Sequence, residues 1–234
     1  MIRHRIFAFF VLLLGLGIMA YAGVQLLDAQ KVYTQGNAAY ESLNDEVKDA
    51  QGIDFEALTA VNADAAAWLY SPGTVIDYPV MKAKDYSYYL RRLPDGTGNA
   101  NGSLFIDYNC AADFSDPLTV IYGHHMKSGR MFGSLKGYKD QEYYLKHPVI
   151  QLYTQQGNYR IELLYGCVIG AGQWRERAFM YPENVGALLA YAAHNTTFRS
   201  SVKYEEGDRF IALSTCSYEF DNARYVVIGV LRAG

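Results

Sequence analysis

The chain has 234 residues, of which 50% are hydrophobic and 19% are charged, enough for one domain with an extension or for two small domains. Its 21 Tyr and 11 Phe argue against a disordered protein, because disordered chains are poor in aromatic residues. A formal net charge of −3 excludes a strongly basic nucleic-acid-binding protein, so nucleic acid is not expected as a partner. Three cysteines without a Cys-x-x-Cys pair exclude a disulfide scaffold and give no sign of a zinc site.

The N-terminus carries a long hydrophobic segment. Residues 1–5 are basic, and residues 6–27 contain no Asp, Glu, Lys or Arg. About 20 apolar residues span a bilayer as a helix, and positive charge before such a segment keeps the N-terminus in the cytoplasm. The sequence therefore predicts a cytoplasmic tail over 1–5, a single-pass transmembrane anchor over 6–27 and an extracellular remainder.

A cleaved signal peptide is the alternative interpretation of this segment. Ala20-Tyr21-Ala22 has the small-x-small form of a cleavage site. The apolar run continues beyond that site through Val24 and Leu27, which favours the uncleaved anchor. Both interpretations export the rest of the chain, so the folded domain is expected to work outside the membrane.

Two helical stretches are predicted after the anchor. Residues 28–52 are polar and free of proline, which is typical of a juxtamembrane stalk or helix. A second stretch starts at Asp54 and has apolar residues on one helical face. It is expected to end at the turn Ser71-Pro72-Gly73.

Short β-branched and aromatic runs follow the turn. Strands are predicted over residues 74–81, 103–108, 118–122, 149–153, 159–165, 210–216 and 225–231, with a hairpin around 156–158. Pro79 indicates an edge strand or a bulge for the first of them. One later helix is expected over 182–193. Several short strands with few helices predict a single β-barrel or sandwich.

Cys216 is the leading candidate for a reactive residue. It ends a predicted apolar strand, just before the polar turn 217–222. A cysteine in a strand is usually a small core residue, but reactive groups tend to lie where a rigid scaffold meets a loop. Cys110 and Cys167 could pair and leave Cys216 free, although sequence cannot establish a pairing.

Histidine and arginine candidates also lie at predicted strand ends. A nucleophilic thiol needs a proton-transfer partner, which is usually histidine. His124 and His125 follow the strand over 118–122 and could meet Cys216 at one rim of a barrel, although either alone could be a surface histidine. Arg224 would face Cys216 if the last two predicted strands pair as a hairpin. The alternative interpretation of Arg224 is an ordinary arginine on the surface, because most arginines are exposed.

Together these residues resemble the sortases, and in particular class B. Leu213-Ser214-Thr215-Cys216 matches the Leu-x-Thr-Cys signature, and Tyr122-Gly123-His124 and Arg224 match the other two catalytic positions. The further matching segments, in the same order as in class B, are Asn62-Ala63-Asp64, Trp68-Leu69, Ile76-Asp77-Tyr78-Pro79-Val80, Tyr88-Tyr89-Leu90, the segment 102–108 and the segment 123–132. The resemblance spans about residues 53–232. His125 stands where many class B members have Asn, and Ala212 where Thr is common.

The resemblance implies a mainly β fold. It implies a closed β-barrel with N-terminal helices, and one helix in the loop before the strand that carries the catalytic cysteine, which 182–193 fits. An uncleaved anchor, a stalk over 28–52 and an extracellular catalytic domain over 53–234 are expected in the membrane of a Gram-positive-type envelope.

The implied activity is that of a cysteine transpeptidase, with chemistry like that of thiol proteases. Cys216 would attack the Thr carbonyl of an Asn-Pro-x-Thr-Asn-like sorting motif near the C-terminus of a secreted protein, and an amine of a cell-wall precursor would resolve the thioester. His124 would transfer protons and Arg224 would stabilise the oxyanion. Ser214 and Thr215 are expected to contact the substrate, and no metal or organic cofactor is needed.

Two other functions remain open at this stage. An exported cysteine peptidase would form the same thioester but transfer the acyl group to water. A catalytically idle, membrane-tethered binding domain would lose nothing when Cys216 is replaced.

Overall fold

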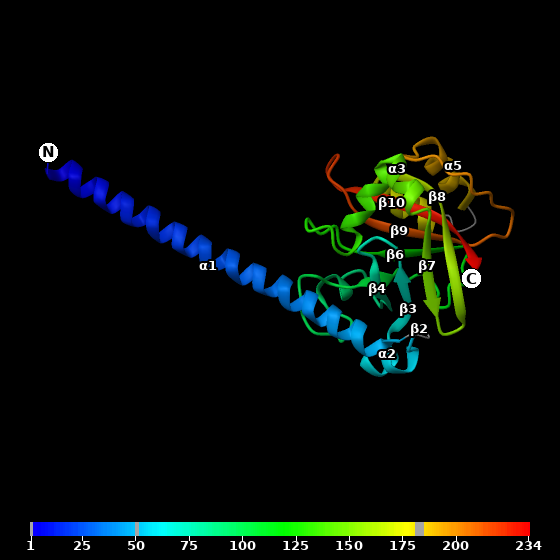
Figure 1. Ribbon diagram of the computed structural model, residues 1–234. Coiled ribbons are helices and arrows are strands. Elements are labelled where there is room, and N and C mark those ends of the chain that lie inside the picture. Colours follow the sequence, from blue (N-terminus) through cyan, green and yellow to red (C-terminus); the bar gives the residue numbers. More distant parts are fainter. Residues whose placement is uncertain (1, 50–51, 181–184) are drawn as a thin grey trace.

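The computed structural model describes residues 2–49, 52–180 and 185–234. A long N-terminal helix, α1 (Ile2–Val47), leads into a β-barrel that carries shorter helices on its outside (Figure 1). The barrel strands are β3 (Ala65–Tyr70), β4 (Asp77–Lys82), β5 (Leu104–Ile106), β6 (Leu118–Tyr122), β7 (Val149–Thr154), β8 (Gly157–Gly170), β9 (Phe210–Cys216) and β10 (Ala223–Ala233). The other elements are β1 (Lys48–Asp49), β2 (Gly52–Ile53), α2 (Phe55–Val61), η1 (Tyr89–Arg91), η2 (Phe132–Lys139), α3 (Gln141–Lys146), α4 (Ala171–Arg175), η3 (Glu176–Met180) and α5 (Val185–His194).

The eight strands form a closed barrel in the order β10-β8-β7-β3-β4-β5-β6-β9. Neighbouring strands are antiparallel except for the pairs β4–β5 and β6–β9, which are parallel. The interior is filled by fully buried aliphatic side chains such as Val80, Val120 and Leu213. This architecture confirms the predicted mainly β, closed-barrel fold, and the strands expected over 118–122 and 210–216 form with those bounds.

The second predicted helix is shorter than expected. Asp54 caps α2 by accepting a hydrogen bond from the backbone N–H of Ala57, but the helix ends at Val61 and residues 65–70 form β3. The run Ala65-Ala66-Ala67 has high helix propensity, yet pairing with β4 and β7 buries Trp68 and Leu69 completely. Tertiary burial here outweighs local propensity.

Pro79 lies inside the barrel sheet and not at an edge. It is opposite Trp68 in the ladder with β3, while the pairing of β4 with β5 begins one residue later, at Val80. Proline has no N–H to donate, and its position just before the parallel ladder fits that restriction. Of the two predicted alternatives, the edge strand was wrong because the barrel closes, whereas the β3–β4 ladder does have an irregularity near Pro79, between Ala65 and Ala67 opposite Met81 and Val80.

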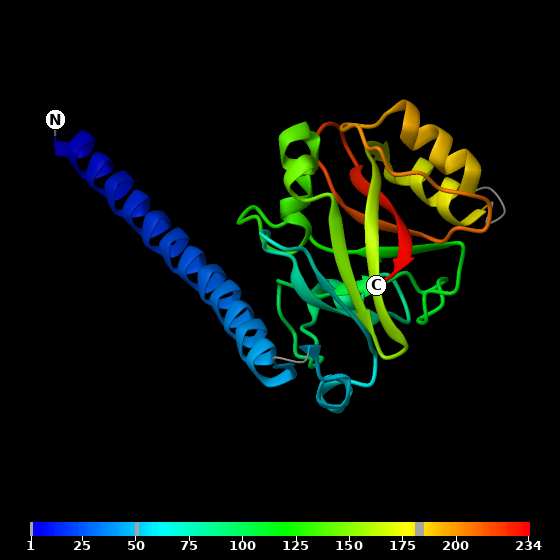
Figure 2. The ribbon, with the colours of Figure 1, turned by 45° about the vertical axis from the view of Figure 1, so that its right-hand side comes forward.

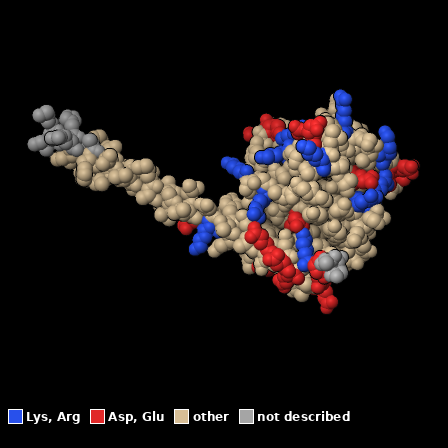
Figure 3. Space-filling view, viewed as in Figure 1, with Lys and Arg blue, Asp and Glu red and all other residues tan. Residues whose placement is uncertain are grey.

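Helix α1 runs without a break through the predicted anchor and most of the predicted stalk. Its segment Phe9–Val47 contains a stretch with a mean hydropathy of 2.1, long and apolar enough to cross a membrane, and none of that stretch is buried. In Figure 3 the helix next to the grey atoms shows only tan atoms, whereas charged side chains gather on the barrel domain. Near its end, Tyr40, Leu43 and Val47 are buried against the domain.

The helices after β8 lie together at one end of the barrel, beside β8 and β10 (Figure 2). Leu188, Leu189 and Ala192 of α5 are buried and form the face that contacts the core. The described helix begins at Val185, so the predicted start at Pro182 lies outside the described residues. Its place before β9 agrees with the expectation of a helix in the loop that precedes Cys216.

Candidate active site

Three strands bring the candidate residues to one rim of the barrel. β6 and β9 run parallel with Tyr122 opposite Ser214, so His124 and Cys216 follow the same end of two adjacent strands. β10 starts at this rim and pairs with β9 in an antiparallel ladder that places Arg224 opposite Cys216. The hairpin register predicted from the sequence is confirmed.

Cys216, His124 and Arg224 line one cavity of about 270 Å³. The other lining residues are Tyr86, Leu90, Phe105, Tyr122, Gly123, Ala171, Trp174, Arg175, Ser214 and Thr215. Arg175 and Arg224 are its charged residues, and none of the described lining residues is acidic. Two guanidinium groups in the lining can donate hydrogen bonds to an anionic group that forms in the cavity. The described residues contain no group of three or more metal-ligating side chains.

Among the three cysteines, Cys216 alone is exposed. Burial raises the pKa of the Cys110 thiol to about 11 and that of the Cys167 thiol to about 12. Both are therefore protonated at neutral pH and inert toward substrate. All three are free, so Cys110 and Cys167 do not form the disulfide that the sequence left open.

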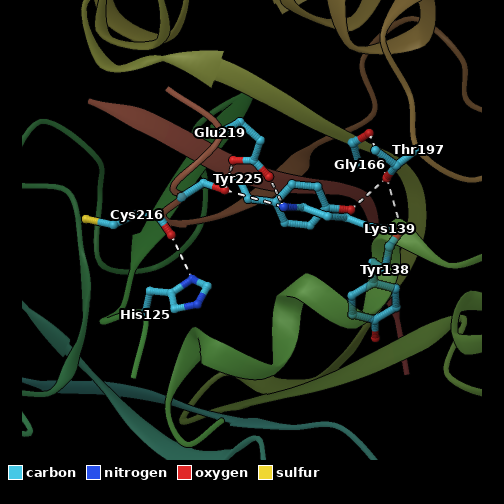
Figure 4. Close-up of polar contacts among 9 residues, drawn as sticks. His125, Tyr138, Lys139, Gly166, Thr197, Cys216, Glu219 and Tyr225 are labelled. Carbon is cyan, nitrogen blue, oxygen red and sulfur yellow. Dashed lines mark hydrogen bonds and ion pairs between the residues drawn. The ribbon is translucent and has the colours of Figure 1, made fainter. Parts of the chain in front are cut away.

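The two neighbouring histidines have different surroundings. The Nε2 atom of His124 lies 2.6 Å from the carbonyl oxygen of Leu90, so Nε2 carries a proton and Nδ1 is the nitrogen left for proton transfer. The Nδ1 atom of His125 donates in the same way to the carbonyl oxygen of Cys216, at 2.8 Å. In Figure 4 the sulfur of Cys216 points away from the ring of His125.

The hydrogen bond from His125 thus holds the backbone of Cys216 next to its thiol. Its ring packs edge-on against Tyr218, with centroids 5.1 Å apart. Burial, helped by the positive charges of Lys136 and Lys139, lowers the pKa of His125, so its ring is neutral at pH 7. His125 does not line the cavity that holds Cys216, whereas His124 does.

The residues next to Cys216 differ in what their hydroxyl groups contact. Thr215 donates from Oγ1 to the carbonyl oxygen of Gly123, at 2.8 Å, and ties β9 to the residue before His124. The Ser214 Oγ atom is buried in the cavity wall and has no hydrogen-bond partner among the described residues. Both predicted substrate contacts are buried, and their role in substrate binding stays a prediction.

The turn after Cys216 is held by a charged cluster. Glu219 accepts hydrogen bonds from Lys139 and Ser217, and Lys139 also lies over the ring of Tyr225, 5.0 Å from its centroid (Figure 4). Burial alone would raise the pKa of Glu219, but these hydrogen bonds lower it to about 2. At neutral pH this charged cluster therefore ties the turn after Cys216 to Lys139 of η2.

Gly102 is a positioning residue that sequence reasoning missed. Its φ of +61° is in the left-handed region that favours glycine. A Cβ atom there would lie 2.7 Å from the Leu90 carbonyl oxygen and 2.9 Å from the His124 ring. The signal available in the sequence was the segment Asn99-Ala100-Asn101-Gly102, whose Asn and Gly residues are typical of a turn.

We expect Gly102→Ala to lower both stability and activity. The positive φ and the close contact with a backbone carbonyl should cost about 1–3 kcal/mol of unfolding free energy. Displacement of the His124 ring should also lower kcat/KM at least about tenfold, since small misplacements of a reacting group cost up to about 100-fold. Denaturant titration and peptide cleavage would measure the two effects. Gly172→Ala is the control, because a Cβ there meets nothing within 4 Å; equal effects of the two variants would contradict the proposed role of Gly102.

The chain is similar in sequence to known proteins over most of its length. No family model matches the chain. Sortase B of Listeria monocytogenes is 34% identical over 208 residues, covering 87% of this chain and 82% of that protein. Sortase B of Staphylococcus aureus is 25% identical over 236 residues, covering 97% of both chains.

Solved structures of sortase B proteins have the same fold as this chain. Sortase B from B. anthracis in complex with AAEK1 superposes with a TM-score of 0.76 at 26% identity, covering 87% of this chain and 99% of that chain. A Staphylococcus aureus sortase B–substrate complex has a TM-score of 0.71 at 25% identity, covering 87% and 94%. A sortase B complexed with triglycine has a TM-score of 0.73 at 25% identity, covering 86% and 98%.

Proposed function

The chain belongs to the class B sortases, a family of cysteine transpeptidases, and on this basis we propose that it joins secreted proteins to a cell-wall amine. The donor is a secreted protein with an Asn-Pro-x-Thr-Asn-like sorting motif near its C-terminus, and the acceptor is an amine of a peptidoglycan precursor. The observation that carries the proposal is the single cavity lined by Cys216, His124 and Arg224. The substrate and triglycine complexes of related sortase B proteins support a peptide donor and an amine acceptor.

The first half of the reaction forms the acyl-enzyme. The thiolate of Cys216 attacks the Thr carbonyl, and the C–N bond of the tetrahedral intermediate breaks to give a thioester. His124, protonated on Nδ1, gives that proton to the leaving amine. Arg224 cannot act as a base because guanidinium keeps its proton, but its planar N–H groups can donate to the oxyanion.

The second half reverses these roles. The amine of the acceptor attacks the thioester, His124 takes up the amine proton, and the sulfur of Cys216 leaves as a thiolate. A peptidase would use water in place of the amine. The two activities therefore share the first half and differ only in the acceptor.

Incubation with a library of peptides that contain such motifs would test the proposal. Mass spectrometry should detect a thioester on Cys216, and an added amine should convert it to an amide product. Release of the free acid alone, at the same rate with and without the amine, would identify a peptidase. Failure of every peptide to form a thioester would contradict the catalytic proposal and favour a binding domain.

Arg224→Lys tests whether the arginine contributes more than charge. Lysine keeps the charge but loses the planar fork of donors, so the acylation rate should fall about 100-fold or more, as when an oxyanion donor is removed. Alkylation of Cys216 by a small reagent should change far less, because that reaction uses no substrate carbonyl. Both rates are measured on the same variant. Turnover near the wild-type rate would show that Arg224 is an ordinary surface charge.

The N-terminal part of α1 is proposed to be an uncleaved, single-pass anchor with the catalytic domain outside the cell. Its support is the apolar, unburied stretch of the helix and the basic residues before it. We expect the mature protein to stay in the membrane fraction after an alkaline wash and to begin near Met1. A mature chain beginning at Gly23 would show instead that Ala20-Tyr21-Ala22 is cut.

A further inference from the structure

A second and larger cavity adjoins the active site. Its volume is about 1000 Å³, and His124 and Leu90 line both cavities. Cys216 and Arg224 line only the smaller one. His124 therefore stands between a space that holds the nucleophile and a separate space large enough for a peptide.

One wall of the larger cavity comes from helix α1. Val32, Tyr33 and Asn37 form it, across from the segment 124–128 that follows β6. The remaining lining residues are Leu90, Arg91, Gly98, Asn99, Ala100 and Tyr218. The same helix that contains the predicted anchor thus reaches the edge of the active site.

Specific contacts fix the helix in this place. Asn99 donates to the carbonyl oxygen of Val32 at 3.0 Å, and Asn101 donates to Oδ1 of Asn37 at 3.1 Å. The hydroxyl of Tyr40, which is 4% exposed, donates to the carbonyl oxygen of Gly102 at 2.6 Å. This contact links the helix to the glycine that supports His124, so the wall and the histidine are held by the same loop.

The position of the cavity suits an incoming amine. During the second half-reaction the acyl group occupies the smaller cavity on Cys216, so the acceptor needs its own space beside His124. The lining of the cavity contains Arg91 and Lys127 and, among the described residues, no Asp or Glu. Its positive charge favours an acceptor molecule that carries a carboxylate in addition to the reacting amine. Val32 lies five residues after Leu27, about 7.5 Å along a helix. An amine on a membrane-bound precursor could therefore reach it.

We propose that this cavity binds the amine acceptor and that Tyr33 and Asn37 of α1 contact it. The proposal rests on the transpeptidase function proposed above. The acceptor nitrogen forms a bond to the thioester carbonyl carbon, and the C–S bond breaks with its electron pair on Cys216. The amine proton passes to Nδ1 of His124, which restores the thiolate of Cys216 and the protonated His124 from which the first half-reaction starts.

The test uses the full chain in detergent, with triglycine as the acceptor. The donor peptide ends one residue after the scissile bond, so that the leaving fragment is too short to reach the helix wall. Thioester formation is followed by rapid-quench mass spectrometry, and amide product is measured over a range of triglycine concentrations. Tyr33→Ala and Asn37→Ala should each raise the half-saturating triglycine concentration about tenfold, and products should shift from amide to free acid.

Two further variants make the result specific. Ala100→Trp places a bulky ring in the cavity from the opposite loop, and it should block transfer to triglycine while the thioester still forms and hydrolyses. Gln35→Ala is the control, because Gln35 is exposed on the same helix and does not line the cavity; its transfer and hydrolysis should match the parent chain.

The outcomes separate the two proposals. No thioester in the parent chain would overturn the proposed function itself. A parent chain that forms amide, with unchanged triglycine saturation in the Tyr33, Asn37 and Ala100 variants, would overturn the acceptor site alone. Equal losses of acylation and transfer in these variants would assign the helix to structure instead. Triglycinamide should need a higher concentration than triglycine; equal saturation would overturn the predicted carboxylate contact.

Discussion

Replacing Cys216 with alanine is expected to abolish both peptide cleavage and the acyl-enzyme. Alanine cannot form a thioester, and the other two cysteines cannot substitute because they are 4% and 1% exposed, with thiols whose pKa values are raised to about 11 and 12. Intact-mass spectrometry after incubation with donor peptide measures the adduct directly. Residual turnover at more than a trace of the parent rate would contradict the mechanism.

Labelling of the folded chain provides the matched control. A thiol alkylator should modify Cys216, which is exposed, and leave Cys110 and Cys167 untouched. After the chain is unfolded, all three should react. If a buried cysteine were labelled first in the folded chain, the assignment of Cys216 as the accessible nucleophile would fail.

Replacing His124 with alanine should remove nearly all activity, whereas His125→Ala should leave a measurable fraction. General acid–base catalysis contributes about 10²–10⁴-fold, and His124 is the histidine that shares the cavity with Cys216. His125 instead donates a hydrogen bond to the Cys216 carbonyl oxygen, so its loss should loosen the backbone beside the thiol. Steady-state kcat/KM of the two variants gives the ranking.

His125→Asn separates these roles further. The Nδ2 atom of asparagine lies in the same place along the side chain as Nδ1 of histidine, and it can donate the same hydrogen bond. This variant should therefore keep more activity than His125→Ala. The opposite order of His124→Ala and His125→Ala would show that His125 is the proton-transfer residue.

The sequence predicted those parts of the site whose position depends on a local pattern of apolar and polar residues along one strand. β9 begins with four apolar residues and ends at a polar turn, and the hairpin to β10 places Arg224 opposite Cys216. β6 is a similarly regular β-branched run that ends before Gly123. The barrel as a whole followed from several such strands together with the family resemblance.

The missed parts depend on contacts between distant segments. The carbonyl oxygen of Leu90, which accepts a hydrogen bond from Nε2 of His124, lies 34 positions earlier in the chain, in a 3₁₀ segment with no hydrophobic period. Asn101 contacts Asn37 across 64 positions. Residues 65–67 are alanines that favour a helix in isolation, and only their neighbours β4 and β7 make them a strand. Pairwise contacts of this kind leave no periodic signal in a single sequence.

Closure of the barrel limits how an extended sorting peptide can be recognised. Each of the eight described strands has a neighbour on both sides over part of its length, but the second half of β8 pairs with β10 alone. On its other side Thr197 donates to the carbonyl oxygen of Gly166 and Tyr191 to that of Val168, so a loop and α5 cover this edge and leave little room for a peptide to join as an additional strand. A repetitive backbone ladder, which would accept many sequences, is therefore a minor source of affinity for the proposed donor. We therefore expect affinity for the proposed donor to come mainly from individual side chains that line the cavity, such as Arg175 and Arg224. We expect exchanges of a few lining residues at this rim to change which peptide the proposed transpeptidase accepts, without any change in the barrel.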